Sequence, residues 1–176
     1  THLSGNTEHQ AQTVDPLQHK IASLLEEIAS LTIEEKIAAV SFNPQQNPEV
    51  SILIPFFNKI KYTVDCLYAL QKQGFNNFEV ILVDDASDDA GCSKLARIKG
   101  VKLICNTHNL GYLLSCNLAA KQAKGNYIVL LNNDTLPLDG WLEHLLNTFQ
   151  HFPDAAIAGS MMLDSKGLIQ EAGGVI

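Results

Sequence analysis

The chain has 176 residues, which is enough for one sizeable domain and a small appendage. Hydrophobic residues make up 46% of it and charged residues 18%, an ordinary globular composition. The 19 acidic and 12 basic residues give a net charge of −7 and form no basic run, which argues against a nucleic-acid-binding surface. No apolar run approaches the roughly 20 residues that cross a bilayer, so we expect no membrane span in this chain.

The first 48 residues divide into three segments. Residues 1–15 are polar, lack periodicity and predict a disordered tail. Residues 16–42 carry apolar residues at helical spacing and predict a helical appendage. Residues 43–48, with two prolines and polar amides, predict a linker to a domain at 49–176.

The appendage contains two helix signals. Leu17, Leu24 and Leu31 lie seven residues apart, but two heptads are too few to indicate a coiled coil. Thr32 followed by Glu35 fits a capping box at the start of a second helix. We expect these helices to pack on their own domain; the alternative is self-association or contact with other domains of a longer chain.

Strand and helix patterns alternate from residue 49 onward. Strands are predicted at 50–54 (closed by Pro55), 78–83, 101–105, 127–131 and 155–159. Helices are predicted at 59–73, 94–98, 112–124 (with Gly125 as its C′ residue) and from about 139. Repeated β-α-β units of this length predict an α/β fold with a mostly parallel, doubly wound sheet flanked by helices. The run at 127–131 has the composition of a strand buried on both faces.

Two of these strands end in polar clusters. Asp84 and Asp85 follow one strand, and Asn132, Asn133 and Asp134 follow another. Right-handed crossovers bring the carboxyl ends of parallel strands to one edge, where α/β proteins bind ligands, so we expect these acids to meet there. The alternative is that they cap helices or close Asx turns.

A glycine-rich phosphate loop is absent from the chain. The first strand runs into Pro55-Phe56-Phe57-Asn58 without a glycine, so neither GxGxxG nor a P-loop follows it. A divalent cation held by carboxylates, Mg²⁺ or Mn²⁺, is the natural substitute for binding a diphosphate.

Four motifs in order resemble the inverting glycosyltransferases of family 2, which have the GT-A fold. They are residues 50–58, residues 83–88, Asn109-Leu110-Gly111 with Asn117, and residues 125–134; Trp141-Leu142 and residues 167–174 also fit. The resemblance covers about residues 49–176 and implies a Rossmann-like GT-A domain, truncated after its nucleotide-sugar-binding part.

The resemblance also implies roles for individual residues. Asp84 takes the nucleotide base with Asp85 beside it, and Asp134 is the metal ligand of a DxD-like motif whose first acid is replaced by Asn132. The implied nucleotide-sugar-binding residues are Pro55, Phe57, Asn58, Asp84, Asp85, Asn109, Gly111, Asn117, Asn132 and Asn133. The cofactor implied is Mn²⁺ or Mg²⁺, and the partners are a nucleotide-diphospho-sugar donor and a glycan acceptor.

The activity implied is metal-assisted transfer of a sugar from the donor to an acceptor hydroxyl, with inversion, in the synthesis of polysaccharides or other glycans. In the family the general base lies well downstream of the DxD motif, so we expect it beyond Ile176 and expect this fragment alone to be inactive. The alternative is a non-catalytic nucleotide-sugar-binding or scaffolding module. A phosphorelay receiver is a second rival, but the Lys that it needs after its last strand is missing.

The spacing of the four cysteines gives an indication of the cellular compartment. Cys66, Cys92, Cys105 and Cys116 are scattered and form no CxxC pair. This spacing favours buried, reduced thiols over a zinc site or a disulfide framework, so we expect a cytoplasmic protein.

Overall fold

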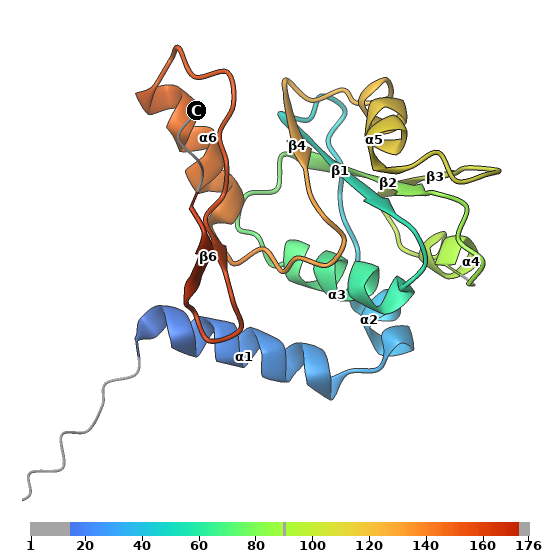
Figure 1. The fold of residues 1–176 in the computed structure, drawn as a ribbon, viewed down its shortest axis with the longest axis horizontal. Helices are drawn as coiled ribbons and strands as arrows, with labels where there is room; N and C mark the ends of the chain where they lie inside the picture. Colours follow the sequence, from blue (N-terminus) through green and yellow to red (C-terminus); the bar gives the residue numbers. More distant parts are fainter. Residues whose placement is uncertain (1–14, 90, 173–176) are drawn as a thin grey trace, which may run out of the picture.

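A four-stranded parallel sheet forms the centre of the computed structural model, which describes residues 15–89 and 91–172 (Figure 1). The strands are β1 (Val50–Phe56), β2 (Phe78–Asp84), β3 (Val101–Cys105) and β4 (Tyr127–Leu130), in the order β3-β2-β1-β4. All three neighbouring pairs are parallel. The predicted α/β fold with a parallel sheet is confirmed.

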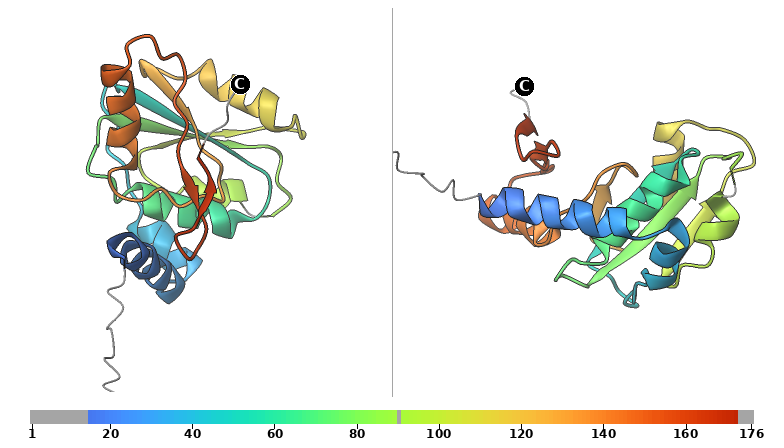
Figure 2. Two further views of the ribbon diagram at one scale, coloured as in Figure 1. Left: turned by 60° about the vertical axis from the view of Figure 1, so that its left-hand side comes forward. Right: turned by 90° about the horizontal axis from the view of Figure 1, so that it is seen from below.

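Helices cover both faces of this sheet (Figure 2). α3 (Ile60–Leu70) and α4 (Gly91–Leu95) lie on the face that carries Ile52, whereas α5 (Tyr112–Ala120) packs on the opposite face, against Leu53. The two faces differ because successive side chains of a strand point to opposite sides. The helices at 94–98 and 112–124 were predicted somewhat differently: α4 begins and ends three residues earlier, and α5 stops at Ala120.

The direction of the chain across the sheet reverses between β1 and β4. The chain steps from β1 to β2 to β3, and α5 then carries it back over the sheet to β4 on the other side of β1. In open α/β sheets a ligand crevice forms outside the carboxyl ends of the strands at such a reversal. A ligand site is therefore expected at the carboxyl ends of β1 and β4.

Pro55 lies inside β1 and does not end it, contrary to the prediction. The Leu53 carbonyl accepts the Leu131 N–H (3.0 Å) on the β4 side, and the Phe56 carbonyl accepts the Asp85 N–H (2.9 Å) on the β2 side. Since alternate residues of a strand face the same neighbour, Pro55 faces β4, beyond the point where pairing with β4 has stopped. Its missing N–H therefore breaks no ladder bond.

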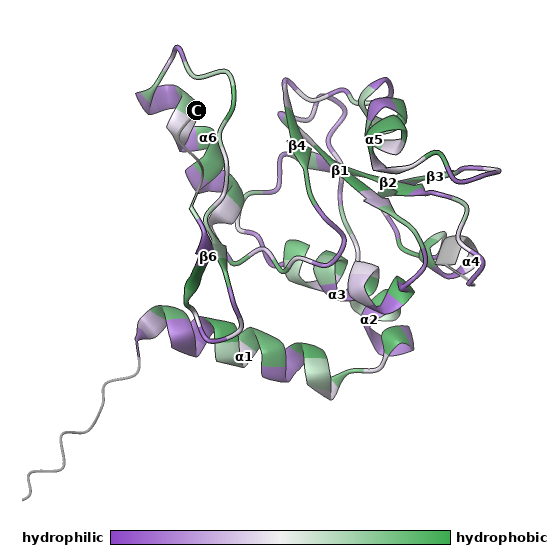
Figure 3. Ribbon diagram, in the orientation of Figure 1, coloured by the Kyte–Doolittle hydropathy of each residue, from purple (hydrophilic) through white to green (hydrophobic). Residues whose placement is uncertain are grey.

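The prediction that β4 is buried on both faces is wrong. Ile128 and Leu130 are 51% and 55% exposed, although every residue of β1 and β2 is buried. Val129 packs on the main core, and the Tyr127 ring stacks on Phe149 at 5.1 Å. β4 is an edge strand, and its apolar residues look the same in sequence as those of the covered strands (Figure 3).

Gly125 is required by a close backbone approach and does not cap a helix, contrary to the prediction. α5 ends at Ala120, so Gly125 is not its C′ residue. A Cβ atom at Gly125 would lie 2.5 Å from the Ser51 backbone nitrogen, closer than real Cβ contacts. The glycine therefore allows the chain to approach β1 as it enters β4.

The last described part of the chain contains α6 (Trp141–His151) and a two-stranded antiparallel hairpin of β5 (Met162–Leu163) and β6 (Ile169–Glu171). Residues 155–159 were predicted as a fifth strand but form none, and Ile157 is 88% exposed. Among the strands of the described residues, none pairs with residues 155–159.

The N-terminal appendage consists of α1 (Pro16–Ser30) and α2 (Ile33–Ala39) and packs on its own domain, as expected. The capping box of Thr32 and Glu35 is confirmed. Figure 1 shows α1 beginning beside the β5–β6 hairpin and running beneath α3 toward α2. The predicted disordered tail lies, except for Asp15, outside the described residues.

Side-chain contacts join the appendage to α3. The Glu27 carboxylate of α1 accepts hydrogen bonds from the Tyr68 hydroxyl (2.8 Å) and the Lys72 ammonium (2.6 Å). The Lys72 bond is the main cause that lowers the pKa of Glu27. From α2 the buried Lys36 ammonium forms an ion pair with Asp65, which also pairs with Lys61 at 2.6 Å. The appendage is thus tied to the helix that follows β1.

The cysteines agree only in part with the expectation of buried, reduced thiols. Cys66 and Cys116 are free and buried, but Cys105 is disulfide-bonded. Among residues 15–89 and 91–172, none of the helices has the length and apolarity that a membrane-spanning helix needs.

Candidate functional site

The loop after β1 is fixed to the loop after β2 by Asn58. Asn58 adopts a left-handed backbone conformation (φ 56°), which Asn tolerates better than most residues. Its N–H donates to the Ser87 hydroxyl (2.7 Å), and its side-chain oxygen accepts the N–H groups of Asp88 (3.0 Å) and Asp89 (3.4 Å). Phe57, just before it, is 50% exposed at the edge of the sheet.

Asp84, at the end of β2, is buried and closes a turn. Its Oδ1 accepts the Ser87 N–H at 2.8 Å, and its backbone carbonyl accepts the Asn106 N–H at 2.8 Å. The first bond, which spans three residues, is a local side-chain-to-backbone bond of the capping kind that the sequence left open as the alternative. Asp84 shapes the loop whether or not it contacts a ligand.

The Asp85 carboxylate accepts more hydrogen bonds than that of Asp84. Its Oδ1 accepts hydrogen bonds from the Asn106 amide (2.8 Å) and the Leu110 N–H (2.8 Å), and its Oδ2 accepts the Gly111 N–H (2.8 Å). Burial by itself raises the pKa of Asp85, but the bonds from Leu110, Asn106, Gly111 and Ser115 outweigh it, so the pKa is lowered. Its carboxylate lies at the N-terminus of α5, where the helix dipole favours negative charge.

The other residues predicted near these loops, Asn109 and Asn117, contribute less to holding them than Asp84 and Asp85 do. Asn109 accepts the Gly111 N–H at 3.1 Å in a local turn, as an Asn-x-Gly does without any ligand. Asn117 is exposed on α5. Asn106, which the sequence analysis missed, joins Asp85 to Ser115. Asn106 could have been found from its position directly after a strand, the pattern that identified Asp85 and Asp134 as candidates.

The turn after β4 is held from below by α3. The Asn132 carbonyl accepts hydrogen bonds from the Thr135 hydroxyl (2.7 Å) and N–H (3.3 Å), and the Cys66 thiol of α3 lies 3.7 Å from it. The Asn133 amide donates to the buried Thr63 hydroxyl, also on α3, at 3.0 Å. These contacts fix the backbone of the turn.

The Asp134 side chain projects from this turn and takes no part in stabilising it. Its side chain is exposed, and within the described part of the chain its carboxylate has no hydrogen bond or ion pair. Burial raises the pKa of the Cys66 thiol to about 12, and the nearby charges of Asp134 and Asp65 act in the same direction. Asp134 is therefore an available anionic ligand on a rigid support.

The three predicted acids share one edge of the sheet but do not form one cluster. β1 separates β2 from β4, which places those strands about 10 Å apart. Over residues 15–89 and 91–172 no group of three or more His, Cys, Asp or Glu residues is arranged to hold a metal ion. A cation at Asp134 would need ligands from the substrate.

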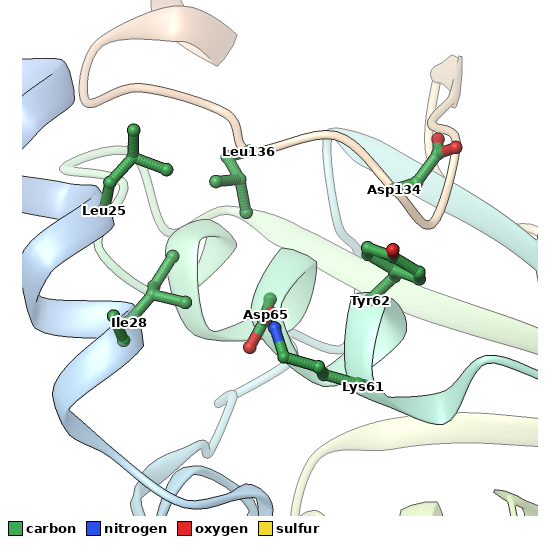
Figure 4. Close-up of a pocket in the computed structure, with 8 residues that line it drawn as sticks. Leu25, Ile28, Lys61, Tyr62, Asp65, Asp134 and Leu136 are labelled. Carbon is green, nitrogen blue, oxygen red and sulfur yellow. Dashed lines mark hydrogen bonds and ion pairs between the residues drawn. The ribbon is translucent and has the colours of Figure 1, made fainter. Parts of the chain in front are cut away.

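A pocket of about 330 Å³ lies beside Asp134 (Figure 4). It is bounded by α1, by the start of α3 and by the turn after β4, through Leu25, Ile28, Ala29, Lys61, Tyr62, Asp65, Asp134 and Leu136. The sequence analysis did not find it, because its walls come from segments about 100 residues apart. Only Asp134 carried a recognisable motif.

Comparisons with known proteins agree with the fold and the motifs. Residues 51–170 match the model of "Glycosyl transferase family 2". An uncharacterized glycosyltransferase of Haemophilus influenzae is 26% identical over 119 residues, which cover 65% of this chain and 37% of that protein. Glycosyltransferase GlyG of Streptococcus pneumoniae is 29% identical over 63% of this chain and 38% of its own length. The O-antigen biosynthesis protein RfbC of Myxococcus xanthus is 32% identical over 78% of this chain and 11% of its own length.

Solved structures show the same fold. The crystal structure of S. aureus TarS 1–349 superposes with a TM-score of 0.52 and 28% identity over 58% of this chain and 32% of that one. The mannosyltransferase PcManGT from Pyrobaculum calidifontis, in complex with GDP-Man and Mn²⁺, has a TM-score of 0.54 and 21% identity over 76% of this chain and 44% of that one. The chain spans less than two fifths of the first two relatives. Because the family match covers more than half of the chain and the sheet is that of GT-A enzymes, the chain belongs to glycosyltransferase family 2.

Proposed function

We propose that this chain binds a nucleotide-diphospho-sugar at the switch point between β1 and β4 and serves a glycosyl transfer to a glycan acceptor. The observation that carries the proposal is Asp134, an exposed carboxylate without a protein partner in the described residues, on a turn that Cys66 and Thr63 hold in place. The complex of PcManGT with GDP-Man and Mn²⁺ supports the same kind of ligand.

The nucleoside would lie along the loops after β1 and β2. Phe57 offers an exposed ring, Pro55 leaves the edge of β1 facing β4 unpaired, and Asn58 holds the two loops together. Asp84 would take the base, and Asp85 would act by shaping the loop at Asn109 and Gly111. Asn132, Asn133 and Asn117 would contribute polar groups near the sugar and diphosphate.

A divalent cation fits Asp134 in one particular way. Mg²⁺ and Mn²⁺ in nucleotide sites are commonly held by one or two carboxylates together with substrate phosphates and water. Asp134 supplies one such carboxylate, and the exposed Asn132 amide stands where the DxD motif has its first acid. When bound, the cation would neutralise charge on the diphosphate leaving group.

The reaction proposed is an in-line displacement. The acceptor hydroxyl oxygen forms a bond to the anomeric carbon as the bond from that carbon to the diphosphate oxygen breaks, so the configuration inverts. The hydroxyl proton passes to a general base, which we place beyond Ile176, so that residues 1–176 alone would not catalyse transfer. We propose a role in glycan or polysaccharide synthesis, in keeping with the O-antigen biosynthesis protein among the relatives.

A second candidate is a non-catalytic module that binds a nucleotide-sugar or serves as a scaffold. Asn132 favours it, because replacing an acid by an amide weakens a metal site. The two candidates differ in their dependence on metal: the enzyme requires the cation at the diphosphate, whereas a scaffold has no such need.

Calorimetric titration with UDP, GDP and dTDP, with and without Mn²⁺, tests the proposal. We expect one nucleotide to bind in a Mn²⁺-dependent manner and its affinity to fall at least tenfold in Asp134→Ala. Asp154→Ala, which removes another exposed acid, is the matched control and should bind as the wild type does. Binding that is independent of both Mn²⁺ and Asp134 would favour the scaffold, and no binding of any nucleotide would contradict the donor site.

A further inference from the structure

The N-terminal appendage contributes a wall to the pocket beside Asp134. Leu25, Ile28 and Ala29 of α1 face Tyr62 of α3 and Leu136 after β4 across a space of about 330 Å³ (Figure 4). The family match begins at residue 51, so this wall comes from a part of the chain outside the family domain. We propose that the pocket is a subsite for a sugar ring of the glycosyl acceptor; this rests on the proposed donor site at Asp134.

The lining has the two kinds of surface that a pyranose needs. A pyranose ring has apolar C–H faces and a rim of hydroxyl groups. Leu25, Ile28 and Leu136 offer apolar contact, and the Tyr62 ring, 49% exposed, offers an aromatic face. Asp134 can accept hydrogen bonds from hydroxyls, and Lys61 can donate them. The volume is at the small end of the roughly 300–1,000 Å³ of small-molecule sites.

The charges at the base of the pocket favour a neutral ligand. Asp65 is paired with both Lys36 and Lys61, so its negative charge is compensated within the protein. Of the two acids that line the pocket, Asp134 at the rim is the one without a partner among the described residues. An uncharged polyol can use these groups without leaving a buried charge unpaired.

The walls of the pocket are held together before any ligand arrives. Glu27 of α1 is bonded to Tyr68 and Lys72 of α3, and the Lys36–Asp65 ion pair joins α2 to the same helix. The turn that carries Asp134 rests on α3 through Thr63. All three walls therefore depend on α3, and a pre-formed site binds with little ordering cost.

The position of the pocket favours the acceptor over the nucleotide. Among the described residues, none in the loops after β2 and β3 lines it, although Asp84 at the end of β2 and Asn109 after β3 belong to the proposed nucleotide site. Asp134 is common to both sites. A ring in the pocket would thus lie next to the sugar–diphosphate end of the donor, where an acceptor hydroxyl must be delivered.

Saturation-transfer NMR with methyl glycopyranosides tests the inference on this chain without requiring turnover. The probes are the methyl glycosides of glucose, galactose, mannose and N-acetylglucosamine. Ala29→Trp places an indole in the pocket from an exposed helix position, and Ala22→Trp, at another exposed position of α1 outside the pocket, is the matched control. Tyr62→Ala removes the aromatic face.

We expect at least one glycoside to bind to the wild type and to Ala22→Trp, and its affinity to fall at least tenfold in Ala29→Trp and in Tyr62→Ala. Circular dichroism would verify that each variant is folded. Absence of saturation transfer from every glycoside, or equal binding by Ala29→Trp and Ala22→Trp, would overturn the inference. Displacement of the glycoside by a nucleotide-sugar but not by the nucleotide would also overturn it, because the pocket would then hold the donor sugar.

Nucleotide titration of the same variants separates this inference from the proposed function. If Ala29→Trp binds nucleotide with Mn²⁺ as the wild type does but no longer binds glycoside, both stand. If nucleotide binds and glycoside binding is insensitive to Ala29→Trp, the acceptor subsite fails and the donor site remains. If the wild type binds no nucleotide, the donor site fails, and with it the assignment of the pocket to an acceptor.

Discussion

The ends of β2 and β4 look alike in sequence and differ in the structure. Each strand ends in a cluster with a carboxylate at the same edge of the sheet. Asp85 after β2 is 4% exposed and accepts three hydrogen bonds from the loop before α5. Asp134 after β4 is exposed, and its turn is held by other groups, among them Asn133 bonded to Thr63.

The difference indicates a division of labour at the edge of the sheet. A carboxylate that satisfies buried N–H groups cannot be released to a ligand without leaving those donors unpaired. A carboxylate on a turn that is stabilised without it can bind a ligand at no structural loss. In this chain Asp85 builds the site, and Asp134 is the residue available to a cation or a hydroxyl.

The largest effect is expected from Asp85→Asn. The amide keeps one acceptor oxygen and replaces the other by an NH2 donor, so either the Leu110 or the Gly111 N–H group loses its acceptor and faces a donor. We therefore expect the free energy of unfolding to fall by about 2–4 kcal/mol. Urea unfolding followed by circular dichroism measures it. A change below about 0.5 kcal/mol, the size usual for surface substitutions, would show that Asp85 is not structural.

The pH dependence of unfolding tests whether the ionised Asp85 carboxylate stabilises the fold. Because the pKa of Asp85 is lowered in the fold, its contribution to stability is present above its unfolded pKa and is lost as the pH falls through the folded pKa. The stability difference between wild type and Asp85→Asn should therefore be constant from pH 7 to about 5 and shrink below pH ~4. Glu27 and Glu35 also have lowered pKa values, and the comparison with the variant removes their contribution. A gap that widens in acid would contradict this.

A smaller effect is expected from Thr63→Val. Valine matches the shape of threonine but cannot accept the hydrogen bond from the Asn133 amide, so we expect a loss of about 1 kcal/mol in stability. The turn should also become less ordered, which would weaken Mn²⁺-dependent nucleotide binding several-fold. Calorimetry on the folded variant measures this second effect, and unchanged affinity would mean that α3 does not support the site.

The smallest effect on stability is expected from Asp134→Asn. Its carboxylate has no protein partner within the described residues, so unfolding should change by less than about 0.5 kcal/mol. Nucleotide binding in Mn²⁺ should nevertheless be lost. A stability loss like that of Asp85→Asn would remove the contrast between the two strand ends.

The strands near the centre of the fold were predictable from local pattern. β1, β2 and β3 begin at the residues predicted, and the capping box of Thr32 and Glu35 formed, because each depends on neighbours in the sequence. The exposure of β4 was not predictable in this way. Ile128 and Leu130 have the same apolar character as the residues of β1, and only the strand order shows that β4 is at the edge.

The site was predictable in its motifs and not in its contacts. Asp84, Asp85 and Asp134 were found as strand-end acids, but the separation of their roles depends on which N–H groups the folded loops bring to each. The pocket required α1 and the turn at Leu136 to meet on α3, and nothing in either segment alone indicates that. Gly125 was predicted as a helix cap because its contact with Ser51 is made only in the folded sheet.

The most direct test of this division of labour is paramagnetic line broadening by Mn²⁺ in the presence of the nucleotide that binds. Mn²⁺ broadens the amide signals of nearby residues, so it reports where the cation lies. The account predicts broadening centred on Asn133, Asp134 and Thr135, abolished in Asp134→Asn and preserved in Asp154→Ala. Broadening centred on Asp84 and Asp85, or broadening unaffected by Asp134→Asn, would contradict it.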